Sequence, residues 1–96
     1  MENKDIVKIK KIVCEAFCVE ESDLMLAKAS YPIKMAQYTF CYHAYCATMN
    51  KDALSKHLNI SGKNMVNSYL SRYGDNLVNS NFRRIDEKIK KRIDEI

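Results

Sequence analysis

The scarcity of chain-breaking residues constrains this sequence most, because its 96 residues include only two glycines and one proline. A β-rich fold needs turn residues about every ten positions, and this chain does not supply them. Hydrophobic residues make up 47% of the chain, which is enough to bury one modest core. The sequence therefore predicts an all-α fold, with a single domain of about six helices over residues 1–96.

Two features of the sequence indicate the cellular compartment, namely the cysteines and the most apolar stretch. Four cysteines occur in a sequence whose residues 1–11 alternate charged and apolar side chains and lack the apolar core of an export signal. This pattern favours free thiols in a reducing compartment. The most apolar stretch, residues 35–49, is shorter than the roughly 18 residues that a membrane span needs. We therefore expect a cytoplasmic protein without a membrane partner.

Apolar residues recur at the three- and four-residue steps of an amphipathic helix along most of the chain. The expected helices span residues 4–19, 22–26, 32–49, 51–58, 61–73 and 80–96. Ser22, Asn50 and Ser61 are the expected N-caps, because their side-chain oxygens accept hydrogen bonds from the first turn. Asn59 is expected in the left-handed conformation at a helix end, and the segment Gly74-Asp75-Asn76 is expected to close the fifth helix.

Residues 32–49 are apolar around most of the helix circumference, which predicts a helix surrounded by the others. One apolar stripe consists of Ile33, Ala36, Phe40, Ala44 and Ala47. A second stripe consists of Met35, Tyr38, Tyr42, Tyr45 and Met49. We expect both stripes in a central core, and a homodimer face is the alternative for the second stripe.

Residues 52–70 have the layout of a helix-turn-helix, with two short helices joined by a tight turn. The whole motif would span about residues 51–73, with its second helix in the major groove of DNA and its inward face formed by Met65, Val66, Tyr69 and Leu70. The outward face would present polar side chains to bases and phosphates, namely Ser61, Lys63, Asn64 and Asn67. An ordinary helical hairpin is the alternative interpretation.

The net charge is concentrated around this motif. Residues 31–85 contain seven basic and two acidic side chains, a balance of +5, whereas the whole chain carries +4. A basic patch beside a recognition helix is what binding to the DNA backbone requires. The basic side chains that we expect to hold phosphates are Lys28, Lys34, Lys56 and Arg72.

The last expected helix, residues 80–96, mixes charges of both signs. Its acidic residues interleave with basic ones, which favours ion pairs on a solvated helix face and involves Asp86, Glu87, Asp94 and Glu95. Its isoleucines lie at helical spacing and form a stripe that we expect to pack on the same bundle. Pairing of this stripe with a second copy of the chain is the alternative.

The sequence offers no recognisable catalytic constellation or cofactor motif. It has no Gly-rich phosphate loop and no pair of carboxylates in an apolar setting. Two expected helices carry Cys14, Cys18, Cys41, His43 and Cys46, but without the Cys-x-x-Cys spacing of a zinc knuckle. We expect buried thiols rather than a zinc site, and we expect neither an enzyme nor a bound cofactor or metal.

From about Ile9 to Tyr73 the sequence resembles the C-terminal DNA-binding domain of the bacterial replication initiator DnaA. The resemblance is carried by KIVCEAFCVEESDLML (11–26), MAQYTFCY (35–42) and DALSKHLN (52–59). It implies a helical, Trp-repressor-like fold that binds double-stranded DNA and regulates replication or transcription, in a bacterial cell or encoded by a phage. The chain would be this module standing alone, without a nucleotide-binding domain and with helix 80–96 attached.

The chain departs from the family in two places that the family uses to contact DNA. The family's Asp-His-Thr/Ser-Thr-Val signature corresponds to residues 62–66, where only Val66 agrees. The arginine of its Ala-Arg-Gln motif corresponds to Ala36. These departures favour a second hypothesis, a protein–protein interaction module that kept the fold and lost DNA reading. Such a module would be an adaptor or a decoy of a replication or transcription protein.

Overall fold

A computed structural model describes residues 3–26, 30–60 and 62–95. Within these ranges the chain forms α-helices and one short 3₁₀-helix and contains no strand, so the predicted all-α class is confirmed. The elements are α1 (Asn3–Phe17), η1 (Glu21–Met25), α2 (Ile33–Thr48), α3 (Lys51–Leu58), α4 (Lys63–Asn76) and α5 (Ser80–Asp94). None of these helices is long and apolar enough to cross a membrane.

The count of about six α-helices is wrong by one, because the segment expected at 22–26 is the 3₁₀-helix η1. The expected cap Ser22 lies inside η1, and the N-cap is Glu20, whose backbone N–H donates to the Asp23 carboxylate at 3.0 Å. The buried Gln37 amide of α2 donates to backbone carbonyls of η1 and its C-cap, those of Asp23, Leu24 and Leu26. These carbonyls therefore bond to α2 instead of to a further turn of helix.

Helix α1 begins at Asn3, one residue before its expected start, and ends two residues earlier than expected. Cys18 adopts φ 58°, the left-handed conformation, and the Val19 N–H bonds back to the Cys14 carbonyl at 3.0 Å. This is a helix-ending motif in which a left-handed residue turns the chain away from the helix axis. The apolar face of α1 contributes buried side chains to the core, including Ile6, Ile9, Val13 and Phe17.

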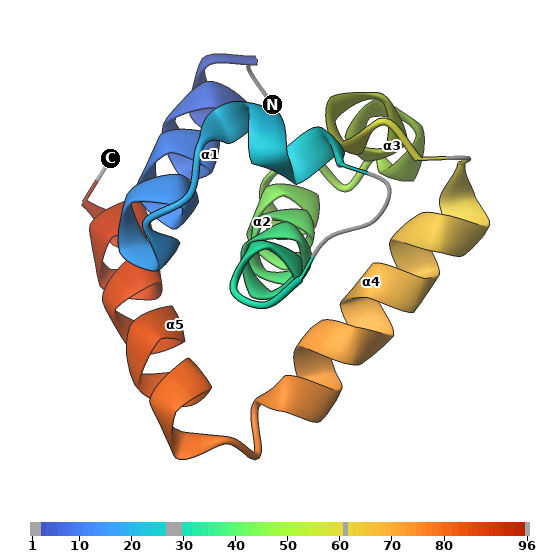
Figure 1. Cartoon of the computed structure of the whole chain (residues 1–96). Helices are drawn as coiled ribbons and strands as arrows, with labels where there is room; N and C mark the ends of the chain where they lie inside the picture. The colour runs from blue at the N-terminus through green and yellow to red at the C-terminus, as the bar shows by residue number, and fades with distance from the viewer. Residues whose placement is uncertain (1–2, 27–29, 61, 96) are drawn as a thin grey trace.

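Helix α2 is the central element, as its apolar circumference predicts. Figure 1 shows α2 in the middle of the view, with the other helices arranged around it, and α2 contacts each of them and η1. Its fully buried residues include Ala36, Phe40, Cys41 and Ala44. The second predicted stripe is only partly internal, because Met49 adopts φ 55° at the end of α2 and its side chain is 69% exposed.

The connection between α3 and α4 confirms two predicted residues and corrects one. The Asn50 side chain accepts a hydrogen bond from the Ala53 N–H at 3.1 Å and caps α3, and Asn59 is left-handed with φ 54°. The N-cap of α4 is Gly62 rather than Ser61, which lies outside the described residues. Gly62 has φ 99°, a conformation that side chains rarely tolerate. At its other end, α4 runs past the expected last residue Tyr73 and ends at Asn76, within the predicted closing segment 74–76, because a single helical glycine costs only about 1 kcal/mol.

Helix α5 packs against α1 and α2. Its N-cap is Asn79, whose side chain accepts from the Phe82 N–H at 3.0 Å. The predicted solvated position of Asp86 is wrong, since this residue is 1% exposed. On the outer surface, Arg92 forms a 2.8 Å ion pair with Glu15 of α1. The helix ends at Asp94, two residues before the expected end.

Candidate nucleic-acid interface

Helix α4 has a buried face and an exposed polar face. Val66, Tyr69 and Tyr73 are buried, and α4 lies along one edge of the molecule in Figure 1. The exposed side chains of the opposite side consist of Lys63, Asn64, Asn67, Ser71, Arg72 and Asp75. This surface, which we call the outer face of α4, carries amide and hydroxyl groups along its length, a cation near each end and the Asp75 carboxylate in its last turn.

The structure places the predicted phosphate contacts in separate groups. Lys34, in the first turn of α2, and Arg72, in the second half of α4, line the same recess, together with the carboxylate of Asp75. Lys56 is exposed on α3. Lys28 and Ser61 lie outside the described residues, so their predicted DNA contacts have no structural description.

Lys63, the first residue of α4, belongs to a different recess. Its Nζ lies 4.0 Å from Oδ2 of Asp52 in an exposed ion pair. The same recess includes Lys51, which was absent from the predicted site, although its position at the start of α3 could have indicated it. The Lys51 Nζ lies 5.5 Å from the centre of the Tyr45 ring, a cation–π contact that directs this ammonium group.

The spacing of these cations follows from the helix itself. Arg72 is nine positions after Lys63, which corresponds to about 14 Å along the axis of α4 and about two and a half turns. Lys63 and Arg72 therefore lie on opposite flanks of the outer face of α4. Asn64, Asn67 and Ser71 lie between them along the helix, and the Asp75 carboxylate follows in the last turn.

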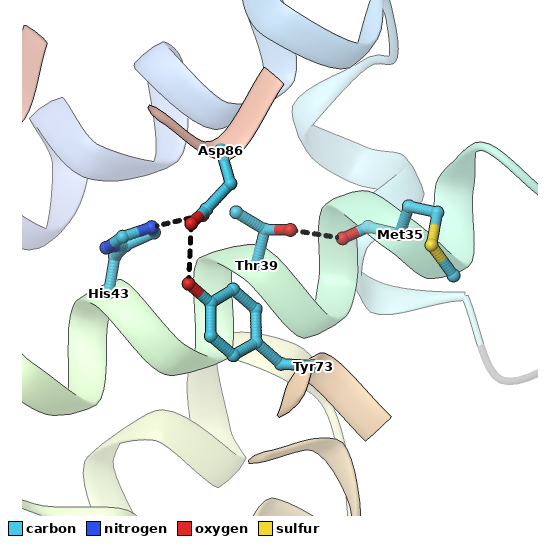
Figure 2. A network of polar contacts seen from close by, with 5 residues as sticks. All are labelled: Met35, Thr39, His43, Tyr73 and Asp86. Atoms are coloured by element: carbon cyan, nitrogen blue, oxygen red, sulfur yellow. Dashed lines mark hydrogen bonds and ion pairs between the residues drawn. The ribbon is translucent and has the colours of Figure 1, made fainter. Parts of the chain in front are cut away.

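A buried polar network holds α4 in place from the inside. Figure 2 shows the Asp86 carboxylate of α5 between His43 of α2 and Tyr73 of α4. The His43 Nε2 atom lies 2.8 Å from Asp86 Oδ1, and the Tyr73 hydroxyl donates to Asp86 Oδ2 at 2.7 Å. These contacts join three helices through side chains that are all buried.

The network stabilises the ionised form of Asp86. Burial raises the pKa of this carboxyl, but the hydrogen bonds from His43 and Tyr73 outweigh burial and hold the pKa below its usual value. Burial and the hydrogen bond to Asp86 raise the pKa of Tyr73, so its hydroxyl keeps the proton that it donates. This network was not predicted from the sequence. A signal was present, because Asp86 lies four residues after Phe82 and three before Ile89 on the buried stripe of α5.

Aromatic contacts reinforce the same arrangement. The rings of Tyr42 and Tyr73 are stacked with centroids 4.1 Å apart, and the rings of Tyr38 and Tyr69 meet edge to face at 5.2 Å. Both pairs join α2 to α4. Met65 was expected to take part in this packing, but its side chain is 38% exposed, because it lies on the flank of α4 rather than on the face of Val66 and Tyr69.

The cysteines divide into two classes. Cys14 and Cys41 are buried, and burial is the main cause that raises their pKa to about 11 and about 12. Cys18 and Cys46 are exposed. In the part of the chain that the structure describes, no group of three His, Cys, Asp or Glu residues lies close enough to hold a metal ion.

Comparison with protein-family models, with curated proteins and with solved structures finds no significant match to this chain. The functional interpretation therefore depends on the geometry of α3 and α4 and on the side chains around them.

Proposed function

We propose that this chain binds double-stranded DNA, that α3 and α4 form a helix-turn-helix, and that α4 enters the major groove. The observation that carries the proposal is the outer face of α4, a polar surface with Lys63 on one flank near its start and Arg72 on the other flank towards its end. A recognition helix needs such a surface, with neutral hydrogen-bonding groups for bases and flanking cations for phosphates.

The side chains of this face suit the edges of base pairs. An asparagine amide both donates and accepts, and it can form two hydrogen bonds with the N6 and N7 atoms of adenine. Asn64 and Asn67 are three residues apart, so they project from the same side of α4. Lys34, Lys56, Lys63 and Arg72 would then hold phosphates of the backbone around the groove.

The packing of α3 supports the same proposal. Leu54 and Leu58 of α3 are fully buried, and α3 contacts both α2 and α4. The Ile60 N–H bonds to the Ser55 carbonyl at 2.9 Å, which tightens the turn around the left-handed Asn59. A short first helix, a tight turn and a second helix with a free face are the parts of a helix-turn-helix. With the resemblance to the DnaA domain, they support a role in replication or transcription control.

The test is equilibrium binding to a fluorescent 24-base-pair duplex of random sequence at low salt. The Lys63→Ala/Asn64→Ala variant removes a cation and an amide from α4, and we expect it to bind at least about tenfold more weakly. The matched control is Lys88→Ala/Asn81→Ala, which removes the same two residue types from exposed positions of α5. Equal affinities for the two variants would overturn the proposed orientation.

Wild-type binding should also weaken steeply as salt is added, because cations that contact phosphates release counterions from DNA. Absence of binding to any duplex at low salt would overturn the proposal itself. Circular dichroism of each variant shows whether the helices remain intact.

A further inference from the structure

A shallow apolar recess lies where the end of α1, the start of α2 and the turn between α4 and α5 meet. Its volume is about 390 Å³. Its apolar lining consists of Phe17, Tyr31, Pro32, Met35, Phe82 and Ile85. The asparagines Asn76, Asn79 and Asn81 complete its rim and supply amide donors and acceptors. We call this surface the apolar recess.

Among the described residues, one of the most exposed large apolar side chains lines this recess, and the most exposed one lies in the turn next to it. Tyr31 is 71% exposed and forms part of the lining, and Val78 is 85% exposed in the turn between the rim residues Asn76 and Asn79. Exposed apolar groups gathered around a hollow are typical of an interaction site, whereas scattered single ones are not. The position of Tyr31 and Val78 therefore indicates a surface that a partner covers.

The surroundings of the apolar recess are positively charged. Tyr31, Met35 and Asn76 also line the neighbouring recess that contains Lys34 and Arg72. At the turn next to Val78, the Arg83 guanidinium donates to the Leu77 carbonyl at 3.4 Å. Within residues 3–26, 30–60 and 62–95, none of these three cations has an acidic group within 4.0 Å. The Asp75 carboxylate is the opposing charge on this surface, so the balance stays positive.

We propose that the apolar recess docks an acidic segment of a partner protein that carries one bulky apolar side chain. The apolar side chain fills the recess against Phe82 and Ile85, and carboxylates on either side of it meet Lys34, Arg72 and Arg83. Apolar burial supplies the affinity, and the charges select an acidic sequence over a basic one.

The charge and shape of the surface favour this occupant over two others. A second copy of the chain carries a net charge of +4 and would bring more positive charge towards the same cations. A DNA duplex would satisfy the cations with phosphates, but its outer surface has no bulky apolar group to fill the recess. This proposal does not rest on the DNA-binding proposal, although Lys34 and Arg72 belong to both.

The chain contains no tryptophan, so a tryptophan in a peptide reports docking without a label. The probe is a synthetic 12-residue peptide of glutamate and aspartate with one central tryptophan. We expect its fluorescence to shift to shorter wavelength and to saturate as wild-type protein is added. The same peptide with alanine in place of tryptophan should fail to compete, and so should a lysine-rich peptide that keeps the tryptophan.

The variants separate the two components of the site. Tyr31→Ser/Val78→Ser removes exposed apolar groups, and Lys34→Glu/Arg72→Glu reverses two charges. We expect each double variant to weaken peptide binding at least tenfold. The matched control is Val7→Ser/Met49→Ser, which removes exposed apolar side chains that do not line the apolar recess, and we expect it to bind as the wild type does.

The outcomes distinguish this proposal from DNA binding. Peptide binding should weaken in both double variants. Duplex binding should be lost in Lys34→Glu/Arg72→Glu but unchanged in Tyr31→Ser/Val78→Ser. This pattern would support two separate ligands on one basic surface. Absence of a spectral shift with the wild type overturns the docking proposal, whatever the duplex does. Equal loss of peptide binding in the Val7→Ser/Met49→Ser control also overturns it, because the contact would then not be at the apolar recess.

Discussion

The Nε2 atom of His43 lies 2.8 Å from Oδ1 of Asp86, and these two buried residues are 43 positions apart in the sequence. Their contact joins α2 to α5, and the second Asp86 oxygen joins both to α4 through Tyr73. The described residues contain no buried side-chain nitrogen or oxygen without a hydrogen-bond partner. The network thus fixes the helix that we propose to read DNA, although none of its members is exposed.

Removal of the Asp86 carboxylate should destabilise the fold strongly. Asp86→Ala leaves the Tyr73 hydroxyl and the His43 ring buried without their partner, and we expect the free energy of unfolding to fall by about 3–5 kcal/mol. The measurement is urea unfolding followed by circular dichroism. Asp94→Ala is the matched control, since it removes an exposed carboxylate from the same helix and should change stability by less than about 0.5 kcal/mol. Similar effects of the two substitutions would contradict the role of the network.

Low pH should reduce the contribution of the Asp86 carboxylate to the stability of the fold. The folded chain holds the pKa of Asp86 below its ordinary value of 3.8, so the unfolded chain binds a proton first as the pH falls. The stabilisation is therefore fully present well above pH 3.8 and is lost as the pH falls through the folded pKa. We expect the stability difference between the wild type and Asp86→Asn to shrink from about pH 5 towards about pH 2 in urea unfolding experiments. Parallel pH profiles for the two proteins would contradict this prediction.

The two asparagine caps should each contribute measurably to the free energy of unfolding. Asn50 and Asn79 accept hydrogen bonds from Ala53 and Phe82 at the starts of α3 and α5. Substitution of either by alanine should lower stability by about 1 kcal/mol in urea unfolding. Asn81→Ala, at an exposed position inside α5, serves as the control and should change stability by less than about 0.5 kcal/mol. A cap variant as stable as this control would show that the cap does not stabilise its helix.

The four thiols should react in two groups. Burial raises the pKa of Cys14 to about 11 and that of Cys41 to about 12, so at pH 8 both are protonated as well as shielded. With Ellman's reagent we expect Cys18 and Cys46 to react in the native protein, and Cys14 and Cys41 to react only after unfolding. The Cys18→Ser/Cys46→Ser variant should not react with the reagent before it is unfolded. Reaction of all four thiols in the native wild-type protein would contradict the buried positions of Cys14 and Cys41.

Local signals in the sequence predicted local features well. The Asn50 cap and the left-handed Asn59 follow from side-chain chemistry within a few residues, and both are confirmed. The central position of α2 follows from its apolar circumference, which only surrounding helices can cover. The Ser22 cap was wrong because Gln37 of α2 bonds the carbonyls of η1, so this segment is a 3₁₀-helix capped by Glu20. The Ser61 cap was wrong because the N-cap of α4 is Gly62, and α4 extends three residues past its expected last residue Tyr73.

Features that depend on distant partners could not be predicted in the same way. Asp86 is surrounded by exposed charges in the sequence, and its burial depends on His43 and Tyr73, which lie on other helices. The apolar recess depends on three separate segments and has no signature in any one of them. Lys63, Asn64 and Asn67 are exposed, as helical periodicity predicts for the outward side of the second helix, and Ser61 lies outside the described residues. Their proposed contacts with DNA stay a prediction.

Selection of bound duplexes from a randomised pool tests most directly whether α4 reads DNA. We predict that the wild type enriches one motif containing adenines, because Asn64 and Asn67 are the amides at the exposed start of α4. Asn64→Ala/Asn67→Ala should still bind duplexes through its cations but should lose the preference at those adenines. Failure of the wild type to enrich any motif, or recovery of the same motif with the variant, would contradict DNA reading by α4.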